Sequence, residues 1–538
     1  MHRRKFLEGL GTIGALPLVG CAGESPTGDE RERSASGSRS AKKPQPYNVL
    51  FIVVDQERRN RFAPSDLSLP AHESLVRRGV SFTTHYANGM PCTPSRSTLY
   101  TGCHVPNTGM FSNIGFNGQA SMPTSIPTLG SLFREAGYHT AYFGKWHLSE
   151  INAGDACENN TRKALQAYGF DEYNACGDYQ GTVYSGHNDD PTIAKDAVSW
   201  LGARSASGQS DPFLLCVNFV NPHDVMFFYP DTIVGGGVGA GEPDDPLYEK
   251  KWKVQLPSSY KEDLSTKPPA HQAYAKVYDL FQPYRDTVRG RWLLERYINY
   301  YYNCQADMDR QLQRVLDALA KSRFADRTII VYTSDHGEMA AVHGLRGKGP
   351  FIYEENNHVP LVVVHPKAKP GATAALSSHV DLVPTVAALV GIDRASIVAK
   401  SKHLAGLDLS RLVFEPSSSS ARSEVLMTFD FGGMVDSEGQ GDALAPSADK
   451  QLRSYLRGYF DGRNKFARYF APGDLHTPTT WNELVSRNDL EGYDLNKDPN
   501  ELTNAGAKPT ANRTFLESLN TKLNALIARE VGADHSSE

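Results

Sequence analysis

The sequence predicts an α/β protein with a large, mostly parallel central sheet flanked by helices, followed by a small C-terminal α+β subdomain. Short apolar runs rich in β-branched residues recur along the chain, and their length suits strands buried on both faces, as in a parallel sheet. These runs are residues 47–54, 138–143, 213–220, 327–333 and 359–364. Helical apolar patterns at residues 129–136, 294–319 and 381–390 predict the helices that flank the sheet.

The part of the chain after residue 46 is too long for one ordinary hydrophobic core, so we expect two domains. The character changes after about residue 411, where a Pro- and Ser-rich stretch precedes three short predicted strands and a terminal helix. We therefore place a larger domain at residues 47–410 and a subdomain at residues 411–538. A formal net charge of −5 gives no support for a nucleic-acid partner.

The first 21 residues predict an export signal rather than part of the fold. Arg3 and Arg4 precede an apolar run that is too short to span a bilayer and ends at Cys21. The paired arginines resemble a twin-arginine signal, and Cys21 resembles the lipidated residue of a bacterial lipoprotein. An uncleaved basic N-terminus is the alternative. Residues 22–46 predict a disordered tether, so we expect an exported periplasmic or cell-surface lipoprotein that meets the membrane only through its anchor.

The stretch from Pro91 to Gly102 holds the candidate nucleophile. Pro94 suits the first turn of a helix and Gly102 its end. Cys92 would then lie at a helix N-terminus, where backbone N–H groups and the helix dipole favour an anion. Arg96 follows about one helical turn later and could reach the same spot. A buried structural cysteine is the alternative for any single residue of this type.

Polar residues follow three of the predicted strands. Asp55 and Gln56 come after the first strand, and Asp335 and His336 come after strand 327–333. Functional residues collect at such strand ends in open α/β sheets. His223 stands behind Pro222 at the end of strand 213–220. A carboxylate that only caps a loop is the alternative at each single site.

Two lysines complete the candidate site. Lys145 and His147 follow strand 138–143, and in an extended segment both would point to the same side. Such a pair suits an anionic group. Lys348 lies between two glycines, which let the backbone approach a ligand closely. A surface lysine, a satisfied histidine and a flexible loop are the alternatives.

Together, the Cys-Thr-Pro-Ser-Arg run at 92–96, Thr-Gly at 101–102, Gly-Lys-Trp-His at 144–147 and Ser-Asp-His-Gly at 334–337 resemble the type I, formylglycine-dependent sulfatases of the alkaline phosphatase superfamily. The resemblance implies an alkaline-phosphatase-like fold and oxidation of Cys92 to formylglycine by a formylglycine-generating enzyme. It also implies a metal held by Asp55, Gln56, residue 92, Asp335 and His336. Arg96 would help to hold residue 92, and the implied substrate-binding and catalytic residues are Lys145, His147, His223 and Lys348.

The chain departs from the commonest sulfatase pattern at Gln56, where many members have a second Asp. The Asp-Gln form resembles choline-sulfatase-like and phosphonate-monoesterase-like relatives. An oxygen-rich ligand set favours Ca²⁺, while His336 leaves room for Mn²⁺ or Zn²⁺. Residues 493–495 and 498–501 resemble the C-terminal subdomain signature of the family.

The function implied is hydrolysis of a sulfate monoester, on an aryl group or a carbohydrate, to an alcohol and sulfate. One alternative is a phosphonate or phosphate mono- or diester hydrolase of the same superfamily. The other is a non-catalytic tethered binding protein, if Cys92 stays unmodified. Five further cysteines leave the disulfides open: Cys216 and Cys304 lie in apolar patterns as buried thiols, Cys157 and Cys176 could pair, and Cys103 gives no signal.

Overall fold

The computed structural model describes residues 46–59, 61–116, 118–151, 163–179, 181–229, 242–281, 288–431, 452–474 and 477–536. The predicted export signal, Cys21 and nearly all of the predicted tether lie outside these residues. The described part belongs to one compact unit that starts at Gln45.

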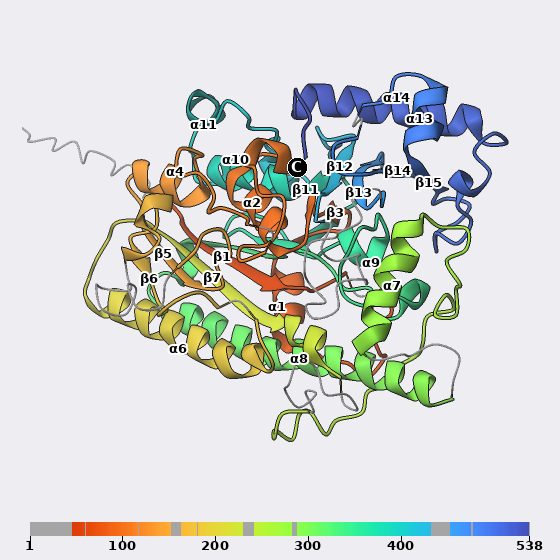
Figure 1. Cartoon of the computed structure of the whole chain (residues 1–538). Coiled ribbons are helices and arrows are strands. Elements are labelled where there is room, and N and C mark those ends of the chain that lie inside the picture. Colours follow the sequence, from red (N-terminus) through yellow and green to blue (C-terminus); the bar gives the residue numbers. More distant parts are fainter. Residues whose placement is uncertain are drawn as a thin grey trace, which may run out of the picture. The chain divides into compact units, whose positions relative to one another are not determined.

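The central sheet has eight strands in the order β10-β2-β9-β8-β1-β7-β5-β6 (Figure 1). In that order they are Gly371–Thr373, Val80–Phe82, Leu361–Val364, Thr328–Ser334, Asn48–Asp55, Phe213–Pro222, His139–Gly144 and Glu172–Tyr173. The β8-β1-β7-β5-β6 half is parallel throughout, while β9 runs antiparallel to both β8 and β2. The predicted mostly parallel sheet is confirmed.

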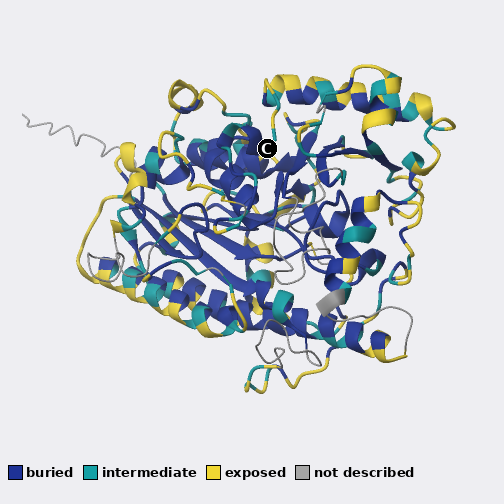
Figure 2. Cartoon of the chain, in the orientation of Figure 1, coloured by how far each residue is buried: buried dark blue, intermediate teal, exposed yellow. Residues whose placement is uncertain are grey.

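Helices cover both faces of this sheet, and β1 is buried along its whole length (Figure 2). Val49, Phe51 and Val53 pack on one face, against α2 (Cys92–Thr101), α4 (Leu129–Glu135) and α10 (Leu382–Leu389). The alternate residues of β1 pack on the other face, against α1 (Pro70–Arg78), α6 (Ser185–Ala206) and α8 (Val288–Lys321). This two-sided burial explains why the strand reads as a continuous apolar run.

A second sheet, in the order β15-β14-β13-β12-β4, forms the C-terminal part. Its strands are Asp489–Asp494, Asn464–Phe470, Tyr455–Phe460, Val425–Phe429 and Gly89–Met90, and α13 (Trp481–Arg487) and α14 (Arg513–Glu530) accompany it. The first four strands follow one another in sequence, but β4 comes from the N-terminal half and pairs in parallel with β12. The C-terminal sheet therefore binds the segment that leads directly into Cys92. The predicted boundary at residue 411 stays a prediction.

Residues 226–289 show little apolar period in the sequence, yet they contain α7 (Pro269–Phe281). Most of its buried positions within the described side chains are tyrosines, alanines and His271, with Val277 as the one aliphatic residue larger than alanine. The apolar stripe is therefore weaker than the one that identifies α8. The remaining short elements are β3 (His85–Tyr86), β11 (Ser377–Ser378), α3 (Val105–Thr108), α9 (Glu354–Asn357), α11 (Arg394–Lys400) and α12 (Ser410–Phe414), with 3₁₀ turns at 166–168, 223–227, 325–327, 342–344, 379–381 and 505–507.

Four described cysteines are free and buried: Cys92, Cys103, Cys216 and Cys304. The expected buried thiols at 216 and 304 are thus confirmed. Cys176 takes part in a disulfide, and Cys157, the partner that the sequence suggests, lies outside the described residues. Within the described part of the chain, each helix is too short or too polar to cross a membrane.

Candidate active site

Neighbouring strands of the central sheet deliver the candidate residues to one edge. Asp55 ends β1, Asp335 follows β8, Lys145 follows β5 and His223 follows β7. Because β8, β1, β7 and β5 are parallel neighbours, their carboxyl ends lie side by side. This edge is where open α/β sheets bind their ligands.

Helix α2 brings Cys92 to the same edge. Cys92 is its first residue, after Pro91 at the N-cap, and Gly102 ends the helix in the left-handed conformation with φ of 72°. The predicted helix N-terminus and the predicted stop are both confirmed. The whole helix is buried, so the backbone N–H groups of its first turn act in surroundings with little water to screen them.

Four side chains form a compact group that could hold a metal ion. The ligand atoms of Asp55, Cys92, Asp335 and His336 all lie within 4.8 Å of one another, and all four residues are buried. The Cys92 Sγ is 3.2 Å from His336 Nε2 and 3.9 Å from Asp55 Oδ1. In a modified protein, the oxygens of formylglycine would stand where this sulfur lies. Two carboxylates with such oxygens form a donor set that suits a hard divalent cation.

The charges in this group also favour a cation. Burial and the nearby Asp55 raise the pKa of Asp335. Burial opposes ionisation of Asp55 as well, but Lys145, His223 and Lys348 hold the pKa of that carboxyl well below its usual range. Two buried carboxylates this close repel each other, and a bound divalent cation would relieve that repulsion.

Arg96 joins the two carboxylates. Its Nε donates to Asp335 Oδ2 at 2.9 Å, and a terminal nitrogen donates to Asp55 Oδ2 at 3.4 Å. The other terminal nitrogen donates to the Lys145 carbonyl at 2.7 Å. Arg96 therefore reaches the centre through the carboxylates and also fixes the turn that carries Lys145.

Two lysines flank Asp55 and face residue 92. Lys145 Nζ lies 2.7 Å from Asp55 Oδ2 and 3.8 Å from Cys92 Sγ. Lys348 Nζ lies 4.0 Å from Asp55 Oδ1. Although burial disfavours a thiolate, Lys145, Lys348 and His336 hold the pKa of the Cys92 thiol well below its usual range. The position therefore stabilises negative charge on whatever group residue 92 carries.

Gln56 sits beside this group in the left-handed conformation, with φ of 73°. Its backbone N–H donates to Asp335 Oδ1 at 3.1 Å, and its Oε1 accepts from Lys348 Nζ at 2.7 Å. Its Nε2 donates to the buried Glu338 at 2.6 Å. Glu338 thereby fixes which end of the amide faces Lys348. Glu338 is not among the residues that the motifs predict for the site, although it directly follows the Ser-Asp-His-Gly motif.

The turn that carries Lys145 and His147 differs from the extended segment that we expected. His147 adopts the left-handed conformation, with φ of 56°, so the alternation argument for residues 145 and 147 was wrong. Asp178 Oδ2 accepts from the His147 N–H at 2.7 Å, and Thr93 Oγ1 donates to the His147 carbonyl at 2.6 Å. These two hydrogen bonds stabilise the left-handed backbone of His147. No local sequence pattern around Asp178 predicts that it binds this turn.

Both candidate histidines lie close to residue 92, since each imidazole interacts with the Cys92 thiol. Burial, Lys348 and Lys145 lower the pKa of His223 to about 3, so its imidazole is neutral at pH 7 in the free protein. Gly181 lies against the ring, where a Cβ would come within 2.7 Å of His223 Nδ1.

The structure thus brings all the predicted site residues within the described ranges to one edge of the sheet, and only Cys21 falls outside those ranges. The fold and the site define an α/β protein with a candidate nucleophile at a helix N-terminus, beside a candidate metal centre and two lysines.

The comparisons with known proteins agree with that class. The family model described as Sulfatase matches residues 47–392. An uncharacterized sulfatase of Escherichia coli (strain K12) is 28% identical over 66% of this chain and 70% of its own length. A Δ4,5-hexuronate-2-O-sulfatase of Bacteroides thetaiotaomicron is 25% identical over 84% of this chain and 82% of its own.

Solved structures share the fold. A 2-O GAG sulfatase aligns with a TM-score of 0.67 at 22% identity, over 90% of this chain and 93% of its own. A phosphonate monoester hydrolase of Agrobacterium radiobacter aligns with a TM-score of 0.63 at 21% identity, over 90% of this chain and 96% of its own. The chain belongs to the sulfatase family, as the family model shows.

Proposed function

We propose that this sulfatase-family enzyme cleaves sulfate monoesters of carbohydrate or aryl alcohols, with Cys92 converted to formylglycine by a formylglycine-generating enzyme. The observation that carries the proposal is the setting of residue 92. It starts a buried helix, lies within 4.8 Å of three metal-type ligands, and faces Lys145 and two histidines. A catalytic nucleophile needs such a setting, which an inert structural cysteine does not.

Asp55, Asp335, His336 and residue 92 would hold one divalent cation, with Gln56 as a proposed further ligand. We rank Ca²⁺ first because oxygen donors dominate, and Mn²⁺ or Zn²⁺ after it because of His336. The ion would supply positive charge that favours the ionised form of a hydroxyl on residue 92. The modified residue would supply a geminal diol, one hydroxyl for attack on sulfur and the other for release of sulfate.

The remaining residues bind the ester and move protons. Lys145 and Lys348 supply positive charge for the sulfate oxygens, and Arg96 holds the carboxylates in place. Neutral His223 can donate a hydrogen bond to the ester oxygen that leaves, and the Lys348 ammonium is the candidate proton donor for that oxygen. His147 accepts the proton of the second hydroxyl when sulfate is released.

A sulfated glycan is the substrate class that we favour. One relative is named for a sulfate on a hexuronate, and a neighbour in fold was solved with D-glucosamine-2-N,6-O-disulfate. The predicted twin-arginine signal and lipidated Cys21 would place this enzyme outside the cytoplasm, where such glycans are met. Peptide mass spectrometry of membrane-released protein would test the lipid on Cys21, and an unmodified N-terminus would refute it.

A phosphonate or phosphate ester hydrolase is the second candidate. The Asp55-Gln56 pair beside His336 favours it, whereas the Lys145 and His147 pair favours a sulfatase. The test compares nitrophenyl sulfate, nitrophenyl phosphate and phenyl phosphonate on one preparation. We expect the highest kcat/KM for the sulfate, and a tenfold advantage of either phosphorus ester would overturn the sulfatase proposal.

A tethered binding protein is the third candidate, if the host leaves Cys92 as a thiol. Mass spectrometry of the peptide that contains residue 92 separates this candidate from the enzyme. We expect the mass of the aldehyde or its hydrate in active protein. An intact thiol in active protein would contradict the formylglycine mechanism.

A further inference from the structure

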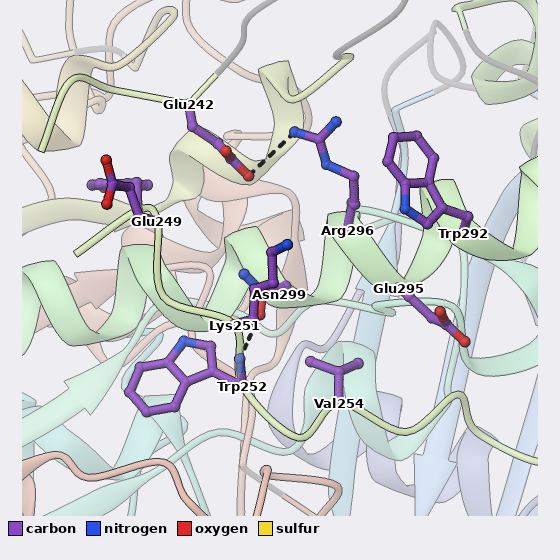
Figure 3. A pocket seen from close by; sticks show the side chains of 10 residues that line it. Glu242, Glu249, Lys251, Trp252, Val254, Trp292, Glu295, Arg296 and Asn299 are labelled. Carbon is purple, nitrogen blue, oxygen red and sulfur yellow. Dashed lines mark hydrogen bonds and ion pairs between the residues drawn. The ribbon is translucent and has the colours of Figure 1, made fainter. Parts of the chain in front are cut away.

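A cavity of about 590 Å³ lies between residues 242–254 and the first turns of α8, away from the Cys92 centre's own residues (Figure 3). We name it the α8 pocket, and the residues that matter for its chemistry are Glu242, Glu249, Lys251, Trp292, Glu295 and Arg296. Its volume falls within the usual range for small-ligand sites, ~300–1,000 Å³. It is built from segments other than those that carry the predicted catalytic and metal residues.

Hydrogen bonds fix the walls of this pocket. Asn299, on α8, accepts the Trp252 backbone N–H at 2.8 Å (Figure 3). It also donates to the Lys250 carbonyl at 3.0 Å. The Trp252 indole N–H donates to Asn303, one turn further along α8, at 2.6 Å. The loop is therefore tied to the helix, and a ligand would meet a largely pre-formed surface.

Trp292 presents an unusual apolar surface here. Its side chain is 48% exposed, whereas Trp146 and Trp252 are buried. Arg296 lies over the Trp292 ring, with its guanidinium carbon 4.9 Å from the ring centroid, and pairs with Glu242 at 3.3 Å (Figure 3). A flat, exposed indole beside fixed charged groups suits a ligand with one apolar face and a polar perimeter.

The charges indicate which ligand fits. Three carboxylates, of Glu242, Glu249 and Glu295, and two cations, of Lys251 and Arg296, line the pocket. Arg296 pairs with Glu242 at 3.3 Å, and Arg291 pairs with Glu295 at 3.0 Å. These ion pairs leave little positive charge free for a sulfate group, but they offer both acceptors and donors to hydroxyl groups. A sugar ring has an apolar C–H face for the indole and hydroxyls around its rim.

The pocket is also connected to the proposed catalytic segment. Phe228, five residues after His223, stacks on Tyr300 of α8 with ring centroids 4.2 Å apart and an interplanar angle of 9°. Arg296 lies 5.6 Å from the Phe228 centroid. One wall of the α8 pocket therefore packs against the segment that positions His223.

We propose that the α8 pocket binds an uncharged, polyhydroxylated sugar residue of the glycan whose sulfate ester is cleaved at the Cys92 centre. This proposal rests on the proposed function, which it deepens from sulfate esters in general to oligosaccharides long enough to reach both sites. Small aryl sulfates would not use the pocket.

The first test measures binding without turnover, in full-length protein carrying Cys92→Ala. The probes are cello-oligosaccharides and N-acetylated chito-oligosaccharides of six residues, whose sugar rings are all uncharged, titrated by calorimetry. We expect at least one to bind, with Trp292→Ala weakening it by about tenfold or more, equivalent to the loss of ~1.4 kcal/mol. Trp292→Phe should recover part of the affinity. Phe414→Ala is the matched control, because Phe414 is 49% exposed and lies on α12.

Binding that is equal in the Trp292→Ala variant, or no binding of any probe, would overturn the proposal. The second test compares kcat/KM for a sulfated hexasaccharide and for nitrophenyl sulfate. Trp292→Ala should lower the first at least tenfold more than the second. Equal losses on both substrates would also overturn the α8 proposal, whereas absence of sulfate release from any substrate would refute the proposed function instead.

Discussion

Two clusters lie at the end of β1, and each unites one histidine with two buried carboxylates. The Cys92 centre contains Asp55, Asp335 and His336. The second cluster, which we name the His72 network, contains Glu57, His72, Asp309 and Tyr332. The two clusters share residue types but differ in their hydrogen bonding. That difference distinguishes a candidate catalytic site from a structural network that stabilises the fold.

The His72 network is complete. His72 Nδ1 lies 2.6 Å from Asp309, and Nε2 lies 3.1 Å from Glu57, while the Tyr332 hydroxyl contacts both Glu57 and His72. Asp309 also accepts the backbone N–H groups of Ala71 and His72 at 3.0 Å, at the start of α1. The network ties α1, α8, β1 and β8 together and leaves no ring nitrogen of His72 without a partner.

Two further histidines beside the Cys92 centre keep unused hydrogen-bonding capacity. Nδ1 of His147 and Nδ1 of His223 are buried and have no hydrogen-bond partner among the described residues. An unsatisfied buried polar atom costs free energy, so proteins keep few of them outside sites that serve a ligand. Unpaired ring nitrogens also occur elsewhere in the described part of the chain, at His85, His104 and His343. The centre is therefore distinguished by unpaired histidine nitrogens together with the cysteine, lysines and carboxylates gathered around them.

The largest expected effect comes from removing the nucleophile. Cys92→Ala should lower kcat by about 10⁴-fold or more, as loss of a catalytic nucleophile does in other hydrolases. The thermal midpoint should change little, because a small side chain is replaced by a smaller one. Steady-state kinetics on nitrophenyl sulfate and differential scanning fluorimetry check the two parts. Cys103→Ala is the matched control for a buried free thiol, and more than 1% residual turnover in Cys92→Ala would contradict the assignment.

A smaller effect should follow when the support of Lys348 is disturbed. Glu338 accepts from Gln56 Nε2 and from the Tyr297 hydroxyl, at 2.6 Å and 3.0 Å. Glu338→Gln places an amide NH₂ against that of Gln56, so the Gln56 amide should turn and present NH₂ to Lys348. We expect kcat/KM to fall by about 10²-fold, the cost of ~1 Å misplacement of a catalytic group. Esters with poor leaving groups should lose most.

The double variant Gln56→Glu with Glu338→Gln tests the contact between residues 56 and 338 by exchanging the amide and the carboxylate. The new carboxylate at position 56 would accept from the new amide at position 338 and from Lys348, so the pair regains its complementarity at unchanged net charge. We expect recovery of at least tenfold over Glu338→Gln alone. A double variant no better than the single one would show that Glu338 acts otherwise than through Gln56 and Lys348.

The sequence predicts the parts of the molecule that repeat a pattern. The buried strands can be recognised in the sequence as apolar runs. Four site residues follow those strands: Asp55, Lys145, His223 and Asp335. Parallel pairing of the strands therefore brings these residues together. Helix α2 can be predicted equally well, because the prolines indicate where it begins and Gly102 indicates where it ends.

What the sequence does not predict depends on tertiary contacts. Asp178, Glu338 and Asp309 are single acidic residues whose partners lie 31, 282 and 237 positions away in the chain. No local period distinguishes them from solvent-facing acids. The left-handed backbone of His147 likewise depends on Asp178 and Thr93. Strand alternation around residue 147 therefore cannot predict this conformation.

The smallest effect on turnover should come from the His72 network, whose loss should appear as lost stability instead. Burial works against a charged imidazole, but Glu57 and Asp309 raise the pKa of His72 to about 10. His72→Gln removes the cation and leaves two buried carboxylates uncompensated, which should cost about 3 kcal/mol. His139→Gln is the matched control, because His139 pairs with Glu172 at 2.7 Å but is 31% exposed, so its loss should cost less than about 1 kcal/mol.

The stabilisation that His72 provides should decrease as the pH rises. Because the folded-state pKa of His72 is raised above the unfolded value of about 6.5, its stabilisation is fully present below pH 6.5 and is lost as pH rises through about 10. The difference in urea midpoint between the wild-type protein and His72→Gln should therefore be largest near pH 6 and shrink toward pH 10. The midpoints should be measured at five pH values. A difference that stays constant or grows over this range would show that His72 stabilises the fold as a neutral hydrogen-bonding group. The contrast with the Cys92 centre would then rest on hydrogen-bond completeness alone.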